Sequence, residues 1–268
     1  PSNVASKDEI LALASTMKGL GRGAIQIGDP TDLELTEGFC AAVAEASERP
    51  VLYISITQSI LEPGAWQSHL DHAEENHKNG AMAYPLFNPM PGLRLFQMNS
   101  AEFFNFLPTW RKLMGGPVDE RIKGLSDPGL RPKLAQEVVD GASARLLGFS
   151  GRWDLVVVVK AILEKNEGLN GRTIAEIARE RGKQPLDVFL DLAVEEKLDT
   201  WFGRNQSNND DDAITTILNS PDVVIGLSDA GAHVVREGGY GLNVHFLSHW
   251  VRDKAIMSLE EGIRQVTS

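Results

Sequence analysis

The chain has a single cysteine, Cys40, among its 268 residues, so an internal disulfide bond is excluded. Cys40 lies in an apolar run that predicts a helix, and we interpret it as a core residue. No apolar stretch approaches the roughly 20 residues that a membrane-spanning helix needs, and no secretory signal is evident. These absences predict a cytoplasmic protein without a membrane partner.

Positive charge is also scarce. The chain has 26 Lys and Arg against 37 Asp and Glu, which gives a net charge of −11 and a pI of about 5.0. A nucleic-acid backbone or an anionic membrane attracts basic surfaces, so neither is expected as a partner. Apolar residues make up 42% and charged residues 24%, as in a globular domain with a sizeable core. A small-molecule substrate is compatible with this composition.

Short apolar strands alternate with helices along much of the chain. We predict strands at 24–27, 51–56, 81–85, 154–162, 200–202 and 223–227, and helices at 33–47, 65–79, 174–181, 186–196, 210–219 and 244–253. Such alternation predicts an α/β fold with a parallel sheet, as a barrel or a doubly wound sheet. We expect one domain over 1–268, with an irregular, proline-rich insertion around 87–150 that forms either a lid or a packed segment without a catalytic part.

The stretch 221–233, with the sequence PDVVIGLSDAGAH, carries the strongest functional signal. Its apolar run at 223–227 suits a strand buried on both faces, and Asp229 follows that strand among small residues. An acid at the carboxyl end of a buried strand is how an α/β barrel presents a catalytic carboxylate. The alternative is an Asp that caps the next turn. His233 follows four residues later, within reach of the same end of the barrel.

The other histidines give weak metal signals. His69 and His72 are three residues apart on a predicted helix, where an exposed polar face is the simpler interpretation. His245 and His249 are four residues apart but lack the intervening Glu of a zinc-protease motif. We interpret that second pair as packing residues of a helix.

The stretch 226–233, GLSDAGAH, resembles the amidohydrolase superfamily, and more closely its branch with D-aminoacylase and the N-acyl-D-amino-acid deacylases. The segments GRTIAEIA at 171–178, LSHWVRD at 247–253 and SLEE at 258–261 resemble the same branch. The resemblance implies a hydrolase on a TIM (β/α)8-type barrel, incomplete in this chain. It also implies that water activated by a divalent metal, expected to be zinc, cleaves the C–N amide bond of an N-acyl-amino acid-like substrate. Asp229 would be the general base and a metal ligand.

Two departures from that family stand out. The chain has no His-x-His pair of the kind that the family's first strand carries, which we interpret as a missing N-terminal segment. The predicted strand ends at 26–29, 55–58 and 84–86 also lack His, although imidazole is a good zinc ligand. Asp29 could replace one ligand, but capping a loop is its simpler role. The alternative function is therefore a non-catalytic or degenerate barrel that binds a ligand or assembles without metal.

Several residues near Asp229 are candidates for binding the substrate. Ser228 and His233 would line the site. Arg204 and Asn205, just beyond the preceding predicted strand, would hold a substrate carboxylate, since Arg binds carboxylates bidentately, although a surface position for Arg204 is equally open. A metal-free serine hydrolase using Ser228 and His233 is a third option, which lacks the second Gly of a nucleophile elbow.

An incomplete barrel would expose strand edges and apolar strand faces. We therefore expect either a homo-oligomer or a missing N-terminal segment to cover them.

Overall fold

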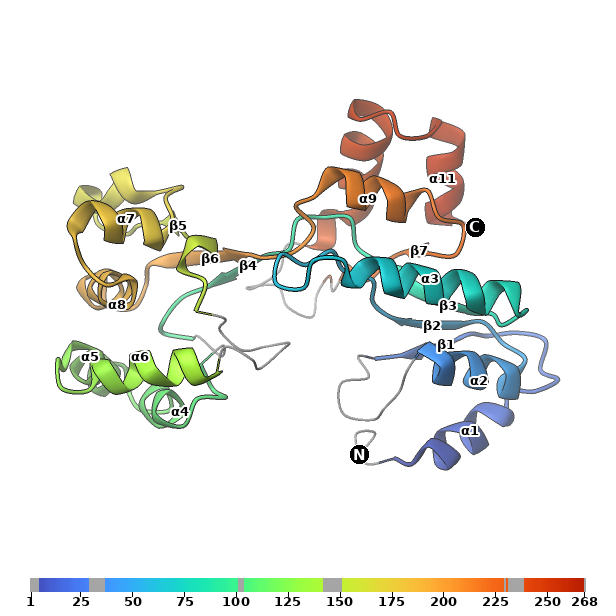
Figure 1. Ribbon diagram of the computed structural model, residues 1–268, viewed down its shortest axis with the longest axis horizontal. Coiled ribbons are helices and arrows are strands. Elements are labelled where there is room, and N and C mark those ends of the chain that lie inside the picture. Colours follow the sequence, from blue (N-terminus) through green and yellow to red (C-terminus); the bar gives the residue numbers. More distant parts are fainter. Residues whose placement is uncertain are drawn as a thin grey trace. The chain divides into compact units, whose positions relative to one another are not determined.

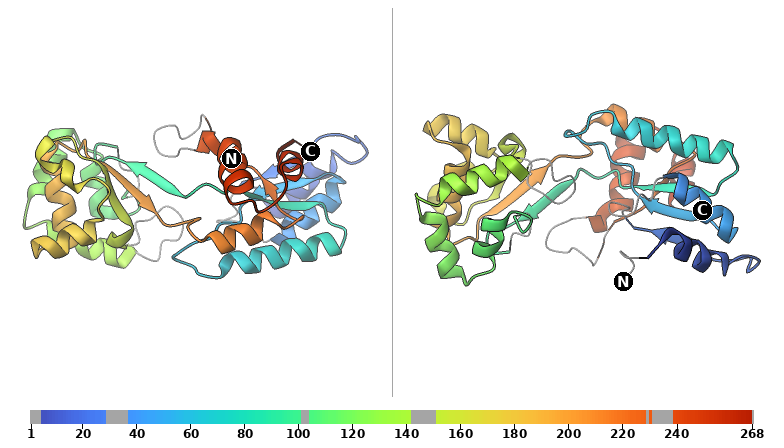
Figure 2. Two further views of the ribbon diagram at one scale, coloured as in Figure 1. Left: turned by 90° about the horizontal axis from the view of Figure 1, so that it is seen from above. Right: turned by 60° about the horizontal axis from the view of Figure 1, so that its bottom comes forward.

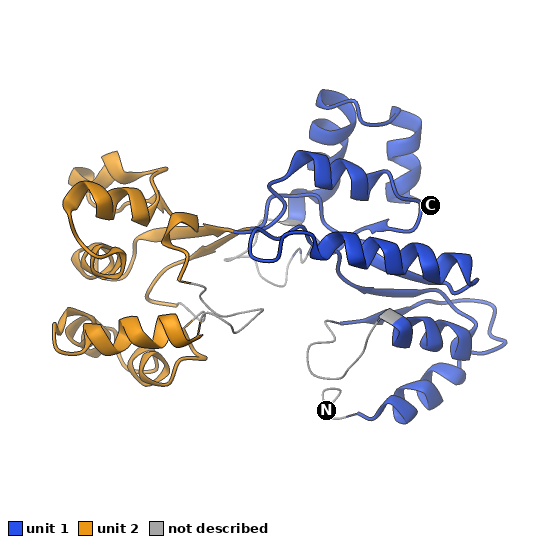
Figure 3. Cartoon of the chain, in the orientation of Figure 1, with its two compact units in different colours: residues 1–92, 206–234, 238–268 blue, residues 93–205, 235–237 orange. Residues whose placement is uncertain are grey.

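Figure 1 shows the computed structural model, which describes residues 5–28, 37–100, 104–141, 151–228, 230 and 239–267. The chain forms two compact units, coloured separately in Figure 3. The first unit comprises 1–92, 206–234 and 238–268, and the second comprises 93–205 and 235–237. We expected one domain with an insertion around 87–150. The second unit begins at Leu93 and continues well beyond that insertion, to Asn205.

The first unit is built on a four-stranded parallel sheet in the order β1-β2-β3-β7. The strands are β1 (Ile25–Ile27), β2 (Val51–Ile54), β3 (Ala83–Phe87) and β7 (Val224–Ile225). This sheet confirms the predicted α/β class. Within the described residues the sheet is open, with β1 and β7 at its edges, so a closed barrel is not formed by these strands alone.

Helices cover the side of the sheet to which Val51, Tyr53, Ala83 and Phe87 point. They are α1 (Lys7–Ser15), α2 (Glu37–Ser47), α3 (Ala65–Lys78), α9 (Asp211–Leu218), α10 (Leu242–His245) and α11 (Leu259–Thr267). Val51 and Tyr53 of β2 pack with Cys40 of α2, and the 1% exposure of Cys40 confirms it as a core residue. Helices α3 and α9, far apart in sequence, lie side by side in Figures 1 and 2 and share a second core.

The segment predicted as one helix at 244–253 forms two different helices. After α10, residues Phe246–Asp253 form a π-helix, η6. The short 3-10 helix η5 (Gly239–Gly241) comes directly before α10. The amide of Lys254 bonds the carbonyl of His249 at 2.8 Å, five residues back, as the wider π-helix requires. No helix in the described part of the chain is long and apolar enough to cross a membrane.

The second unit has its own antiparallel sheet, in the order β4-β6-β5. Its strands are β4 (Leu93–Phe96), β5 (Val156–Lys160) and β6 (Trp201–Asn205). The strands predicted at 154–162 and 200–202 exist, but the prediction that they join the parallel sheet is wrong. The reason is β4, which the sequence did not indicate: it pairs with one edge of β6 while β5 pairs with the other.

Helices and aromatic side chains complete the second unit. The helices are α4 (Pro108–Met114), α5 (Val118–Ser126), α6 (Arg131–Asp140), α7 (Ile174–Arg181) and α8 (Pro185–Glu195), with 3-10 turns η3 (Trp153–Leu155) and η4 (Glu164–Leu169). Phe104 stacks on Trp110 with ring centroids 4.0 Å apart, and Phe189 meets Phe202 at 4.6 Å. Each such pair adds roughly 0.5–1.5 kcal/mol beyond its burial. Residues from the expected insertion thus share one core with residues from α8 and β6.

A buried carboxylate holds the end of α8 to the loop after β5. Glu196 is 3% exposed. Its oxygens accept hydrogen bonds from the amides of Ile162 (2.9 Å) and Leu163 (3.1 Å), from Asn166 Nδ2 (2.9 Å) and from Thr200 Oγ1 (2.6 Å). Burial by itself raises the pKa of Glu196, but these hydrogen bonds outweigh burial and hold that pKa below its usual value.

Candidate active site

The carboxyl ends of β1, β2, β3 and β7 lie at one edge of the parallel sheet, because all four strands run in the same direction. Ligand and catalytic sites of α/β proteins gather at this edge. The polar residues that follow the strands in the described part are Ser55 and Thr57 after β2, Asn88 after β3 and Ser228 after β7. This edge is therefore the candidate site.

Ser228 lies three residues beyond the last residue of β7, because this strand ends at Ile225 and not at 227 as the sequence predicted. Its Oγ accepts a hydrogen bond from the amide of Ala230 at 3.2 Å, which stabilises a turn. Asp229 and His233, the other residues predicted at this strand end, lie outside the described residues.

Sequence reasoning missed Asn88, because it ended the third strand too early. The strand β3 runs to Phe87, so the first residue beyond its carboxyl end is Asn88, and the predicted end at 84–86 is too early. Asn88 Nδ2 donates to the carbonyl of Leu227 at 3.0 Å, directly before Ser228. The signal that could have found it is the dipeptide Asn88-Pro89, since Asn-Pro marks a turn.

Arg204 and Asn205 lie within a strand, rather than just beyond it as the sequence predicted. Both belong to β6 of the antiparallel sheet in the second unit, whereas Ser228 belongs to the first unit. Arg204 is 1% exposed, so the alternative of a surface position is wrong. Arg94 of β4 lies opposite Arg204 in register. Burial, together with the like charge of Arg94, lowers the pKa of Arg204 to about 10, and the side chain still carries its positive charge at neutral pH.

The described residues at the sheet edge do not fit a zinc ion. Their oxygen donors are hydroxyls and carboxamides, whereas zinc prefers thiolate, imidazole and carboxylate ligands. Asn88 Oδ1 already accepts a hydrogen bond from the amide of Met90 at 3.0 Å. Nowhere in the described ranges do three His, Cys, Asp or Glu side chains come together to hold a metal. Asp29, Asp229 and His233 lie outside those ranges.

The histidines that can be located agree with their structural interpretation. His69 and His72 are exposed on α3. The rings of His245 and His249 stack with centroids 5.0 Å apart and planes tilted by 17°. Burial lowers the pKa of His245, and the charge of a protonated His249 lowers it further.

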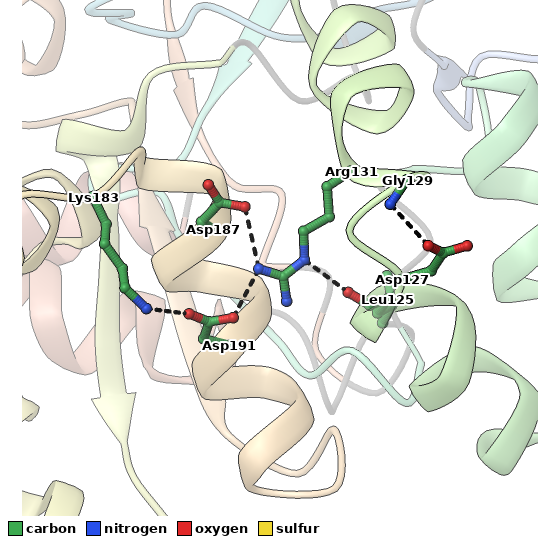
Figure 4. A network of polar contacts seen from close by, with 7 residues as sticks. All are labelled: Leu125, Asp127, Gly129, Arg131, Lys183, Asp187 and Asp191. Carbon is green, nitrogen blue, oxygen red and sulfur yellow. Dashed lines mark hydrogen bonds and ion pairs between the residues drawn. The ribbon is translucent and has the colours of Figure 1, made fainter.

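The second unit contains a cavity of about 1000 Å³, lined among others by Arg131, Lys183, Asp187 and Asp191. Figure 4 shows Arg131 reaching from α6 toward α8, with Nη1 3.1 Å from Asp187 Oδ1 and 2.8 Å from Asp191 Oδ1. Arg131 Nε also donates to the carbonyl of Leu125 at 3.1 Å, and Lys183 Nζ lies 2.9 Å from Asp191 Oδ2. These charges pair with one another, and the pairs of Arg131 join α6 to α8. We therefore interpret this group as structural rather than catalytic.

Both the strand order and the site define an α/β protein with a parallel sheet. No protein-family model matches the chain. In fold the chain is similar to N-acyl-D-glutamate deacylase from Bordetella bronchiseptica, which was solved with zinc and a phosphonate inhibitor. The TM-score is 0.50 and the sequence identity is 15%. The match covers 100% of this chain and 45% of the deacylase chain. A crystal structure of D-aminoacylase gives a TM-score of 0.48, 16% identity and coverage of 98% and 44%. The fold that the chain shares with N-acyl-D-glutamate deacylase confirms, at the level of fold, the resemblance drawn from 226–233.

Curated relatives match a shorter stretch. Uncharacterised proteins of Mycobacterium bovis and Mycobacterium tuberculosis are 30% identical over 109 residues, which is 38% of this chain and 18% of theirs. The chain thus matches about a fifth of these curated relatives and spans less than half the length of the solved deacylase.

Proposed function

We propose that this protein hydrolyses the amide bond of an N-acyl amino acid, with Asp229 as the proton acceptor. One observation carries the proposal: β7 is the strand of a parallel sheet whose carboxyl end leads through Ser228 to Asp229. Catalytic acids of α/β barrels occupy this place. The fold is shared with an enzyme described as an N-acyl-D-glutamate deacylase, which suggests the same substrate class.

The proposed reaction needs a base and a proton donor. The Asp229 carboxylate takes a proton from a water molecule as the water oxygen attacks the amide carbon. The C–N bond then breaks, and the same proton passes to the leaving amine. The resemblance to the family implies a divalent metal that would polarise the amide carbonyl. The described donor set does not fit zinc, so we assign no step to a metal.

Arg204 and Asn205 are proposed to bind a carboxylate at β6 of the second unit. Arg204 supports this role because its guanidinium is buried and keeps its charge at neutral pH. A guanidinium out of bulk water forms stronger bidentate hydrogen bonds to a carboxylate than an exposed one. His233 and Ser228 are proposed to line the site, as their positions after β7 suggest.

The test is amine release from N-acyl-D-glutamate and other N-acyl-D-amino acids by the full chain, with and without added Zn²⁺. We expect turnover by the wild type and a loss of roughly 100-fold or more in Asp229→Asn. Asp71→Asn, the same change on the exposed face of α3, is the matched control and keeps wild-type activity. Equal activity in Asp229→Asn would overturn the role of Asp229. No turnover by the wild type under either condition would overturn the hydrolase and leave the non-catalytic barrel.

A further inference from the structure

We infer that Asn88 is a positioning residue, which holds the backbone of Leu227 and Ser228 in the turn after β7 and so supports the catalytic role proposed for Asp229. The catalytic consequence rests on the proposed function, whereas the turn itself is held by hydrogen bonds among described residues.

Asn88 uses both ends of its side-chain amide. Nδ2 donates to the carbonyl of Leu227 at 3.0 Å, and Oδ1 accepts from the amide of Met90 at 3.0 Å. One step earlier, the amide of Gly226 donates to the carbonyl of Phe87 at 2.9 Å, the last rung of the backbone pairing between β3 and β7. The Asn88 side chain thus continues that pairing beyond the end of the sheet.

Leu227 needs such support because its backbone is strained. Its φ is +66°, in the left-handed region that side chains other than Gly rarely adopt. A residue keeps such a conformation only where its surroundings impose it, and such residues cluster at functional sites. Leu227 decides the direction in which Ser228 leaves the strand. The hydrogen bond from Asn88 therefore acts at the residue where that direction is set.

Asn88 is itself held by a second asparagine. Asn208 Nδ2 donates to the carbonyls of Asn88 (2.8 Å) and Met90 (3.1 Å). Asn208 is 8% exposed, and its Oδ1 accepts from the amide of Gln58 at 3.2 Å. The amide of Asn208 donates to the carbonyl of Gln58 at 2.8 Å. A chain of uncharged amide groups thus runs from the end of β2, through Asn208 and Asn88, to the end of β7.

The competing interpretation is that Asn88 only stabilises its own loop, since an Asn side chain that accepts from the amide two residues on forms a common local turn. Two substitutions separate these roles. Asn88→Asp keeps the acceptor for Met90 but removes the donor to Leu227 and sets a carboxylate oxygen against a carbonyl oxygen. Asn88→Ala removes both hydrogen bonds. Asn219→Asp, at the exposed end of α9, is the matched control for the change in charge.

The experiment measures amide hydrogen exchange of the full chain together with kcat and KM for N-acyl-D-glutamate. We expect Asn88→Asp to speed exchange in peptides covering 224–230 by about tenfold, with α9 and the second unit unchanged. We also expect kcat to fall by about tenfold or more with KM within about twofold, because misplaced groups lose orientation. Asn219→Asp changes neither readout.

The outcomes separate this inference from the proposed function. Wild-type exchange at 224–230 in Asn88→Asp overturns the inference. Asn88→Asp and Asn88→Ala that destabilise the chain alike, with kcat per folded molecule unchanged, would show a merely structural role. That result also overturns the positioning role of Asn88. If the wild type shows no turnover, the proposed function fails, while faster local exchange in Asn88→Asp still supports the role of Asn88 in the turn.

Discussion

Replacing the buried Glu196 by Gln should destabilise the second unit, although the two side chains have almost the same shape. Each carboxylate oxygen accepts two hydrogen bonds, at distances from 2.6 to 3.1 Å. In Gln one oxygen becomes an NH₂ group, which is itself a donor. In either orientation of the Gln side chain, its NH₂ group faces the backbone N–H of Ile162 or the backbone N–H of Leu163. That buried N–H then has no acceptor.

The expected magnitude follows from these contacts. An unsatisfied buried donor costs roughly 1–3 kcal/mol, and hydrogen bonds to a charged acceptor are worth more than those to a neutral one. We therefore expect Glu196→Gln to lower the free energy of unfolding by about 2–4 kcal/mol. The adjacent Glu195 offers the matched control, because it is exposed and pairs with Lys165 at 2.5 Å. Glu195→Gln should cost less than about 1 kcal/mol, as exposed ion pairs do.

The assay is urea unfolding at pH 7, followed by tryptophan fluorescence, which in the second unit reports on Trp110, Trp153 and Trp201. The folded pKa of Glu196 is lowered from its usual value, so its stabilisation is present above pH 4.5 and is lost as the pH falls through the folded pKa. The difference between wild type and Glu196→Gln should therefore shrink in acid. Equal losses in Glu195→Gln and Glu196→Gln at pH 7 would refute the reasoning.

Three further predictions follow from the first unit. Leu227→Gly should be more stable than Leu227→Ala by about 1 kcal/mol in thermal or urea unfolding, since Gly adopts a positive φ without strain. A higher stability of Leu227→Ala than of Leu227→Gly would contradict the strain. The lowered pKa of His245, caused by burial and by His249, means that the unfolded chain binds more protons below pH 6.5. Stability should thus fall as the pH drops from 7.5 to about 5.5, and less steeply in His245→Gln. The edges β1 and β7, which no other described strand covers, predict self-association in sedimentation velocity, and a monomer at every concentration would contradict this.

The sequence by itself determined the local structure. The helix predicted at 174–181 is found with these bounds, because Thr173 and Glu176 form a capping box at its start and Gly182 adopts the left-handed conformation at its end. The strand before Ser228 could be predicted for a similar reason: its short β-branched run favours a strand whatever its neighbours are. Caps, breakers and short apolar runs act over a few residues, so they can be recognised without the rest of the chain.

Only the tertiary structure decided which strands pair, and with that the positions of Arg204, Asn205 and Asn88. An apolar run such as 156–159 suits a parallel or an antiparallel neighbour, and its pairing with β6 follows from the competition of distant segments for hydrogen bonds. This pairing buries Arg204 in the second unit. Asn88 and Glu196 went unnoticed because polar residues are usually exposed. Their importance arises from partners that folding brings together, as Leu227 lies 139 residues from Asn88 along the chain.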